Sequence, residues 1–482
     1  MQKHIDHNLI HDLQDKFNDE FEDGVLQNVI MKSGGRHVTL NRNILTKATS
    51  QHYFSHELKR FKVTDQKSSG RCWLFAGLNV VRCNLYQNDN HILSHLKKLE
   101  FSQSYLFFYD KLERSNTFIE NLYSLFKEKK DADDRVVSIL LRNVCNDGGD
   151  WNNFVDLIEK YGLVPEVIMP DRHGATSAKP MNDALKEVLR RTARDLFHNI
   201  HDYDLIKKTA LQQVYTIISL HLGSPPDCFE LFELIDAFKR MNKIKNNLSS
   251  QQVILDQEHV KIKHTPVDFY YELVKPHTDV REYMCLIHDP RTHKYPYYHT
   301  YTKQFPMGVT KPCQDSSQHD HFLLNVDMRT IQHASMLSIA KHHKSVWIGC
   351  EFGRNADVAH GVLDDDLHQL SRYVYHQHEE MSKQDRIEFK HVSGAHAMVI
   401  VGVNITNDNH EQQAQPNRWR VENSHGEKSG RNGYFVMMNN WFDENVHQVA
   451  IHKSCLPSHL QHYNKDHPIV LPMWFNTFNS KL

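Results

Sequence analysis

The sequence contains no apolar run of the length that a membrane-spanning helix requires. The longest apolar stretch is residues 396–403, whereas a membrane span needs about 20 apolar residues. Residues 1–19 are polar and rich in His and Asp, and they lack the apolar region of a secretory signal peptide. We therefore expect neither a membrane segment nor export, and the sequence favours a cytoplasmic protein.

Charge of one sign is not in excess, since 57 Lys and Arg stand against 59 Asp and Glu, for a formal net charge of −2. This balance lacks the positive field typical of nucleic-acid binding, so we expect no nucleic-acid partner. The 8 cysteines are scattered without the spacing of a disulfide framework, which is typical of reduced thiols in a cytosolic protein. Neither an HExxH nor a CxxC pattern occurs, and we predict no metal and no organic cofactor.

One segment places a reactive residue type in a pattern that would activate it. Cys72 follows a Ser-Ser-Gly turn, and apolar residues recur after it at positions 74, 78, 81 and 85. We therefore predict that Cys72 lies in the first turn of a buried helix, where the helix dipole and unpaired N–H groups favour a thiolate. Gln66 is placed to direct an amide N–H towards the sulfur, which suits an oxyanion formed when Cys72 attacks a carbonyl. For the cysteine alone, the alternative interpretation is a buried apolar residue without chemistry.

Residues 66–82 (QKSSGRCWLFAGLNVVR) resemble the nucleophile segment of the bleomycin hydrolase and aminopeptidase C family, the intracellular branch of the papain-like cysteine peptidases. Further stretches resemble the same family in patches over most of the chain: HLGSPP (221–226), DFYYELVKP (268–276), HDPRTHKY (288–295) and PIVLPMW (468–474). The resemblance implies a cysteine aminopeptidase that acts on peptides with free N-termini and assembles as a homohexamer.

Two later segments supply the remaining parts of such a site. His396 begins the apolar stretch 396–403, and Asn423 closes the strand-like stretch 418–423. Neighbouring antiparallel strands can place two such residues side by side, so that the Asn oxygen accepts from one imidazole nitrogen while the other faces Cys72. Both segments resemble the family's His and Asn segments, which implies that His396 is the base and Asn423 its orienter. Cys72 and His396 are farther apart than the about 130–150 residues typical of papain-like enzymes, and an insertion accounts for the excess.

The order of the predicted elements indicates the fold class. Helical periodicity dominates the first part of the chain, and we predict helices over 102–112 and 151–161 and another ending at Leu222. After residue 346, β-rich runs over 346–353, 396–403, 418–423 and 433–438 predict strands. Together with the resemblance, this order predicts an α+β fold with a papain-like two-lobed core, a large helical insertion and terminal arms. The predicted divisions are an N-terminal arm (1–60), a helical lobe with the nucleophile (61–169), the helical insertion (170–345), a β lobe with the His and Asn (346–466) and a C-terminal arm (467–482).

A glycine pair and the C-terminus are predicted to contact the substrate. Gly148 and Gly149 permit close backbone approach, and the family's corresponding segment docks the substrate strand, which implies a substrate-binding role for Gly148, Gly149 and Asp150. Family members also extend a terminal arm into the cleft, where the terminal carboxylate anchors the substrate's amine; here that carboxylate belongs to Leu482. Residues 480–482 also spell Ser-Lys-Leu, a peroxisomal address. A tail buried in the cleft would be hidden from a receptor, so we favour the cytoplasmic interpretation.

One position departs from the family pattern. The family usually has Trp two residues after the catalytic Asn, where it shields the Asn–His hydrogen bond from water, whereas this chain has His425. We expect the smaller, polar ring to shield the pair less well and to make it more sensitive to pH. This departure and the unusual tail leave two alternatives open: a catalytically weakened oligomer that holds peptides, and an acyl transferase that uses the same Cys–His pair.

Overall fold

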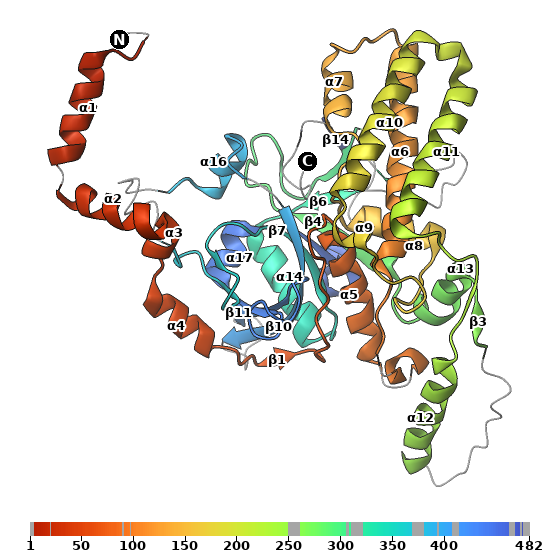
Figure 1. The fold of residues 1–482 in the computed structure, drawn as a ribbon. Coiled ribbons are helices and arrows are strands. Elements are labelled where there is room, and N and C mark those ends of the chain that lie inside the picture. Colours follow the sequence, from red (N-terminus) through yellow and green to blue (C-terminus); the bar gives the residue numbers. More distant parts are fainter. Residues whose placement is uncertain are drawn as a thin grey trace.

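The computed structural model combines helices with one large sheet, as the α+β prediction requires (Figure 1). The structure describes residues 4–19, 21–88, 91–96, 98–248, 261–304, 308–309, 322–368, 380–392, 395–406, 414–461, 468–472 and 475. No helix within these ranges is both long and apolar enough to cross a membrane.

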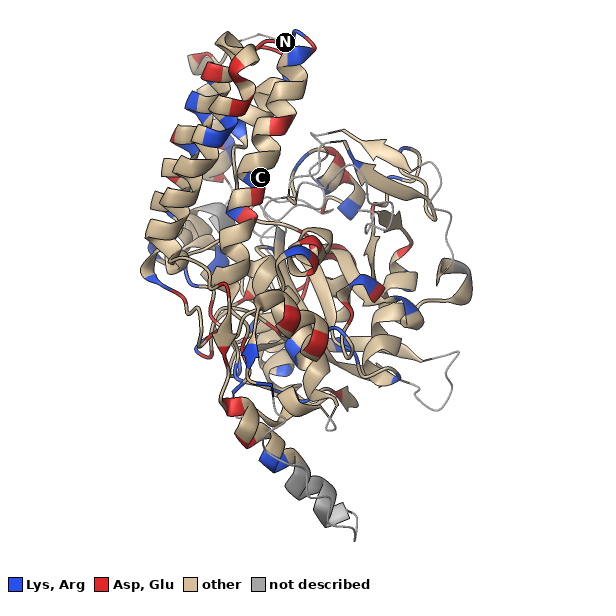
Figure 2. Cartoon of the chain, turned by 90° about the vertical axis from the view of Figure 1, so that its right-hand side faces the viewer, with Lys and Arg blue, Asp and Glu red and all other residues tan. Residues whose placement is uncertain are grey.

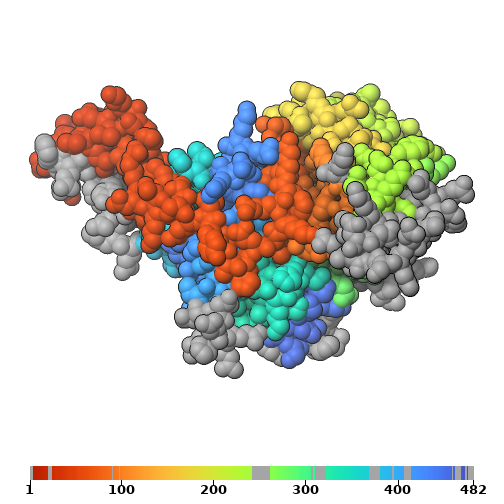
Figure 3. Space-filling view, turned by 90° about the horizontal axis from the view of Figure 1, so that it is seen from below, coloured from red at the N-terminus to blue at the C-terminus, as the bar shows by residue number. Residues whose placement is uncertain are grey.

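Helices at the N-terminus extend away from the rest of the molecule, as Figures 1 and 3 show. They are α1 (His7–Asp19), α2 (Phe21–Ser33), α3 (Gly35–Val38) and α4 (Arg42–Ser50). α1 buries no residue, whereas α4 places Ala48 in a small apolar cluster with Val362 and Leu367. α3 and the residues before α4 also contact the body, since the Arg36 guanidinium donates to the Gly353 oxygen and Leu40 pairs with His368.

The next part of the chain is helical and carries the nucleophile segment. It consists of α5 (Cys72–Tyr86), α6 (Gln103–Lys127), α7 (Arg135–Arg142), α8 (Trp151–Tyr161), α9 (His173–Thr176), α10 (Lys179–His198) and α11 (Tyr203–Leu222). α6, α10 and α11 pack against one another, and acidic (red) and basic (blue) residues are interspersed along the long helices in Figure 2. The helices predicted to end at Tyr161 and Leu222 are confirmed, and each is followed by a glycine with positive φ, Gly162 at 72° and Gly223 at 84°. The helix predicted over 102–112 is longer than expected, because α6 continues to Lys127.

Within the described residues, the main sheet has 12 strands, in the order β14-β5-β6-β4-β13-β7-β10-β11-β12-β9-β8, with β1 also paired to β10. Its strands are β1 (His56–Glu57), β4 (Tyr283–Ile287), β5 (Thr300–Lys303), β6 (Leu323–Asn325), β7 (Val346–Glu351), β8 (Ala356–Asp357), β9 (Val362–Leu363), β10 (Ala395–Thr406), β11 (Gln415–Glu422), β12 (Tyr434–Met438), β13 (Val446–His452) and β14 (Ile469–Leu471). The runs predicted as strands after residue 346 are confirmed as β7, β10, β11 and β12. Besides short 3-10 and π helices, the described residues form the pair β2 (Phe229–Glu230) and β3 (Lys263–His264), and helices α12 (Glu233–Leu248), α13 (Pro266–Asp268), α14 (Met328–Ala340), α16 (Lys383–Glu388), α17 (Asn439–Asn445) and α18 (Ser458–Gln461).

The region predicted as a helical insertion is not purely helical. Besides α10, α11 and α12 it contains β4, β5 and β6, and β4 joins the main sheet by antiparallel pairing with β13. The sequence signal for β4 was ambiguous because the strand is a short, mostly buried apolar run, and periodicity does not distinguish such a run from a buried helix.

Helix α5, which begins with the predicted nucleophile Cys72, is held against the centre of the sheet. α5 packs on β7 and β10, and the indole Nε1 of Trp347 on β7 donates to the backbone oxygen of Trp73 at 3.3 Å. Trp73 is fully buried, and Trp347 is only 2% exposed. This contact sets the depth at which the first turn of α5 meets the strands that carry the remaining site residues.

Candidate active site

Cys72 is the first residue of α5, as predicted, and its side chain is 5% exposed. The residue before it, Arg71, is fully buried and forms a bidentate ion pair with Asp171, at 2.8 and 2.7 Å. The preceding turn leaves no room for a larger residue, since a Cβ on Gly70 would lie 2.3 Å from the Cβ of Asp147. The backbone directly before Cys72 is therefore anchored.

His396 and Asn423 meet as predicted. His396 lies on β10, and Asn423 directly follows β11, the strand paired with β10 through Val399 and Glu422. The imidazole Nε2 of His396 is 2.8 Å from Oδ1 of Asn423, which is fully buried, while His396 is 9% exposed. The amide oxygen is an acceptor, so Nε2 carries the hydrogen of this bond.

Cys72 lies near the strand pair that carries His396. Across the sheet His396 is paired with Cys350 on β7, and the Cys350 thiol donates to the His396 backbone oxygen at 3.5 Å. Burial raises the pKa of the Cys350 thiol well above its usual value, and the proximity of Cys72 raises that pKa further. The structure therefore brings the predicted nucleophile and base to the same junction of α5, β7 and β10.

Gln66 is tied to the asparagine segment. Its backbone N–H donates to the Ser424 oxygen at 2.9 Å, and Gly426 N–H donates to the Thr64 oxygen at 3.1 Å, so residues 64–66 and 424–426 run side by side. The Ser424 hydroxyl donates to Gln66 Oε1 at 2.6 Å, and Gln66 Nε2 donates to the Ser69 oxygen at 2.9 Å. These bonds fix which side of the Gln66 side-chain amide presents its N–H groups. Ser424, which makes one of them, is a residue of the candidate site that the sequence prediction missed.

His425 lies over the His396–Asn423 pair. Its ring centroid is 4.9 Å from that of His396 and 5.6 Å from that of Phe352, which itself lies 4.9 Å from His396. Asn423 Nδ2 donates to His425 Nδ1 at 3.2 Å. The polar ring therefore takes the position over the pair that we expected, and Phe352 adds apolar cover beside it. The hydrogen bond to Asn423 was not predicted.

The predicted substrate segment packs against Trp73, the residue that follows Cys72. Gly148 has a positive φ of 94°, and its backbone oxygen accepts from Arg114 on α6. A Cβ on Gly149 would lie 2.7 Å from the indole of Trp73, so only glycine permits this approach to α5.

Asp150 is used structurally. As the N-cap of α8, its carboxylate accepts from the Asn153 backbone N–H at 3.1 Å. The carboxylate also pairs with Lys303 at 2.6 Å, and the residue is only 4% exposed. A substrate-binding role of residue 150 can therefore concern only its backbone. Leu482, the other predicted substrate contact, lies outside the described residues.

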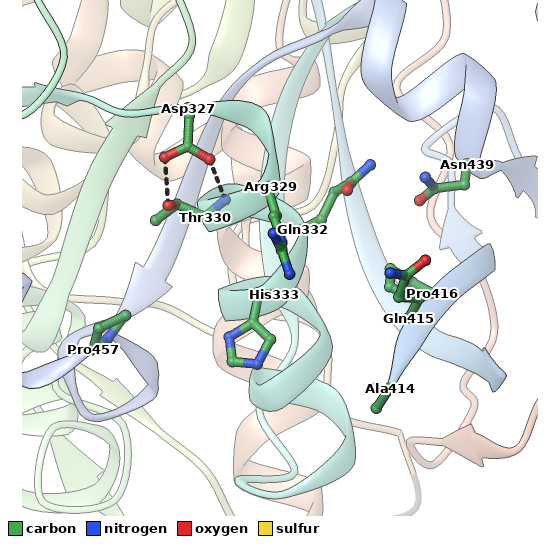
Figure 4. Close-up of a pocket in the computed structure, with 10 residues that line it drawn as sticks. All are labelled: Asp327, Arg329, Thr330, Gln332, His333, Ala414, Gln415, Pro416, Asn439 and Pro457. Atoms are coloured by element: carbon green, nitrogen blue, oxygen red, sulfur yellow. Dashed lines mark hydrogen bonds between the residues drawn. The ribbon is translucent and has the colours of Figure 1, made fainter. Parts of the chain in front are cut away.

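A separate cavity of about 640 Å³ lies at the start of α14 (Figure 4). Its lining combines residues from α14, β11 and adjoining segments: Asp327, Arg329, Thr330, Gln332, His333, Ala414, Gln415, Pro416, Asn439 and Pro457. The Asp327 carboxylate already caps the helix through Thr330 and accepts from the Tyr298 hydroxyl at 2.6 Å. None of the predicted site residues lines this cavity. In the described part of the chain, no group of three or more His, Cys, Asp or Glu side chains is arranged to hold a metal ion.

Comparison with known proteins gives one consistent result. The profile of the Peptidase C1-like family matches residues 4–477. Aminopeptidase C of Listeria monocytogenes is 36% identical over 453 residues, covering 93% of each chain. Bleomycin hydrolase of Homo sapiens is 31% identical over 434 residues, covering 88% of each chain. The crystal structure of PepW from Lactobacillus rhamnosis HN001 superposes with a TM-score of 0.82 at 30% identity and covers 98% of each chain.

Proposed function

The chain belongs to the Peptidase C1-like family, and on this premise we propose that it is an aminopeptidase whose triad is Cys72, His396 and Asn423. The predicted resemblance to the bleomycin hydrolase and aminopeptidase C family and the predicted papain-like fold are confirmed by the relatives and by the PepW superposition. Relatives named aminopeptidase C and bleomycin hydrolase likewise support the predicted enzyme class, a cysteine aminopeptidase.

The triad is supported by one observation above all: the 2.8 Å bond between His396 and Asn423 at the junction where α5 presents Cys72. In the proposed reaction the Cys72 thiolate attacks the first peptide carbonyl, forming a C–S bond and an oxyanion. The Cys72 backbone N–H and the Gln66 amide donate to this oxyanion. Imidazolium His396 protonates the leaving amine as the C–N bond breaks, which leaves a thioester.

Hydrolysis of the thioester completes the cycle. Neutral His396 takes a proton from water as the water oxygen attacks the thioester carbonyl, and the amino acid leaves as the Cys72 sulfur recovers its electron pair. Asn423 holds the His396 ring in the orientation that both proton transfers need. No step calls for a metal or an organic cofactor.

The substrate side is proposed from the resemblance and from the glycine pair. The backbone at Gly148 and Gly149, held by Arg114 and packed on Trp73, docks the substrate strand. The Leu482 carboxylate anchors the free amine of a peptide and so limits cleavage to the N-terminal residue. The protein acts in the cytoplasm as a homohexamer; an exposed Ser-Lys-Leu end would instead direct it to peroxisomes.

Hydrolysis of an aminoacyl-coumarin by the purified protein under reducing conditions tests this function. We expect turnover by the wild type and none by Cys72→Ala, with the same oligomeric state on gel filtration. A Cys72→Ala protein that retains full activity contradicts the triad. A protein that binds peptides without turnover supports the peptide-holding alternative, and transfer of the acyl group to an added amine in preference to water supports the acyl transferase.

A further inference from the structure

The asparagine of the triad lies between two histidines. Its Oδ1 faces His396 Nε2 at 2.8 Å, and its Nδ2 faces His425 Nδ1 at 3.2 Å. The two imidazole rings lie 4.9 Å apart at an interplanar angle of 35°. The buried amide of Asn423 thus joins both rings in one hydrogen-bonded chain.

The chemistry of the amide gives this chain a direction. An Nδ2 group only donates, so His425 Nδ1 must accept, and the His425 ring must be neutral with its hydrogen on Nε2. Tryptophan is usual at this position, and its indole N–H can only donate a hydrogen bond and cannot accept one. A histidine therefore does something here that the larger ring does not: it gives the Asn423 NH₂ group a partner.

We propose that His425 is a positioning residue, whose neutral Nδ1 holds the Asn423 amide in the orientation that presents Oδ1 to the catalytic His396. This role presupposes the proposed function. Without that acceptor the amide is bound on one side only, and rotation by half a turn would set its NH₂ group against the Nε2–H of His396. The base would then lose its orienting bond and the stabilisation of its charged form.

The surroundings of His425 keep the ring neutral near physiological pH. Burial lowers the pKa of His425. Asp65 forms an antiparallel backbone bridge with His425, and its carboxylate opposes this shift without cancelling it. Lys67 pairs with that carboxylate, and the rings of Phe352 and His396 lie in contact with the His425 ring.

Acid should therefore switch this role off. A protonated His425 carries hydrogens on both nitrogens, so its Nδ1 repels the Asn423 Nδ2 group and places a second positive charge beside imidazolium His396. The His396–Asn423 bond should consequently weaken as pH falls through the lowered His425 pKa. The acid side of the pH profile should include this ionisation in addition to those of the catalytic pair.

Two substitutions separate an acceptor from an apolar shield. His425→Gln supplies an amide oxygen that can accept from Asn423 and does not titrate, whereas His425→Phe keeps a ring and has no acceptor. At pH 7.5 we expect His425→Gln to stay within about threefold of the wild-type kcat. We expect His425→Phe to lose about tenfold in kcat with little change in KM, as for one lost hydrogen bond. His360→Gln, at an exposed histidine, is the control.

The rate of Cys72 alkylation by iodoacetamide as a function of pH gives a readout independent of substrate. In His425→Gln this rate should persist to lower pH than in the wild type, because the extra ionisation is gone. Two results overturn the role of His425. One is an alkylation profile of His425→Gln whose acid limb is identical to that of the wild type. The other is a His425→Phe variant that turns over as fast as His425→Gln. If His425→Phe does not fold, the pH profile of the Gln variant decides alone. An inactive wild type whose Cys72 is not selectively alkylated overturns the proposed function, and this role with it.

Discussion

Arg82 on α5 and Glu422 at the end of β11 form a buried ion pair with 2.9 Å between Nη2 and Oε1. Their side chains are 4% and 2% exposed. The pair joins the helix that begins with Cys72 to the residue directly before Asn423. Burial raises the pKa of the Glu422 carboxyl, although the adjacent Arg82 opposes this shift. The two halves of the proposed site are thus tied together by a charge pair that neither half could bury alone.

Removing the cation of this pair should be costly. Arg82→Met leaves the Glu422 carboxylate buried without its partner, and we expect the free energy of unfolding to fall by about 3–5 kcal/mol. The double variant Arg82→Met/Glu422→Leu removes both charges and should recover most of this loss. Urea unfolding of the three proteins measures both effects. A double variant as unstable as Arg82→Met would mean that packing, and not the unpaired charge, causes the loss.

The cysteines should differ sharply in reactivity. Burial raises the pKa of Cys83 to about 12 and raises the pKa values of Cys145, Cys285, Cys350 and Cys455, which makes these thiols poor nucleophiles at neutral pH. With limiting iodoacetamide, we expect peptide mapping to find Cys72 modified first, and His396→Ala to slow that modification by about tenfold or more. Among the cysteines that the structure describes, Cys228 is exposed and competes with Cys72, so Cys228→Ser is the matched control and should leave the rate at Cys72 unchanged. Equal labelling of Cys72 and Cys228 would contradict an activated thiol.

Local patterns accounted for the parts of the site that the sequence predicted. The apolar period after Cys72 and the turn before it specify the start of α5. The strand signals place His396 on β10 and Asn423 directly after β11, the neighbouring strand. The glycines after α8 and α11 end those helices where the sequence indicated, because they adopt positive φ.

The contacts that the sequence did not reveal depend on how segments fold and pack, and some of them join segments far apart in the chain. The Ser424 hydroxyl meets Gln66 only because residues 64–66 and 424–426 run side by side, and no local pattern records that arrangement. The bond between Asn423 and His425 depends on the turn that follows β11, and that between Arg114 and Gly148 on the packing of α6. β4 was missed for a different reason, since a buried strand and a short buried helix share the same apolar composition.

Gln66 and Ser424 should act as a pair on the chemical step. If the Gln66 amide donates to the oxyanion, Gln66→Ala should lower kcat by about 100-fold or more with a small change in KM. Ser424→Ala removes the donor to Gln66 Oε1 and should lower kcat by only about tenfold, because the Gln66 amide keeps its hydrogen bond to the Ser69 backbone oxygen. Ser50→Ala, on the exposed end of α4, is the control. The double variant should be no worse than Gln66→Ala, because Ser424 acts through Gln66; additive losses would contradict that link.

The C-terminal segment should determine which end of a peptide is cleaved. The last described residue, Phe475, is 9% exposed and packs on Tyr295, with ring centroids 4.9 Å apart, so a chain shortened to residue 475 keeps this anchor. If the Leu482 carboxylate binds the free amine, this charge-assisted bond should contribute about 1.5–3 kcal/mol, so full-length protein should cleave a peptide with a free amine about 10–100-fold faster than its N-acetylated form. Deleting residues 476–482 should remove most of this preference, chiefly by raising the rate on acetylated and longer peptides. Leu482→Ala keeps a terminal carboxylate at the same place and should keep the preference. Equal rates on both peptides with the full-length protein would show that the tail does not select the substrate's N-terminus.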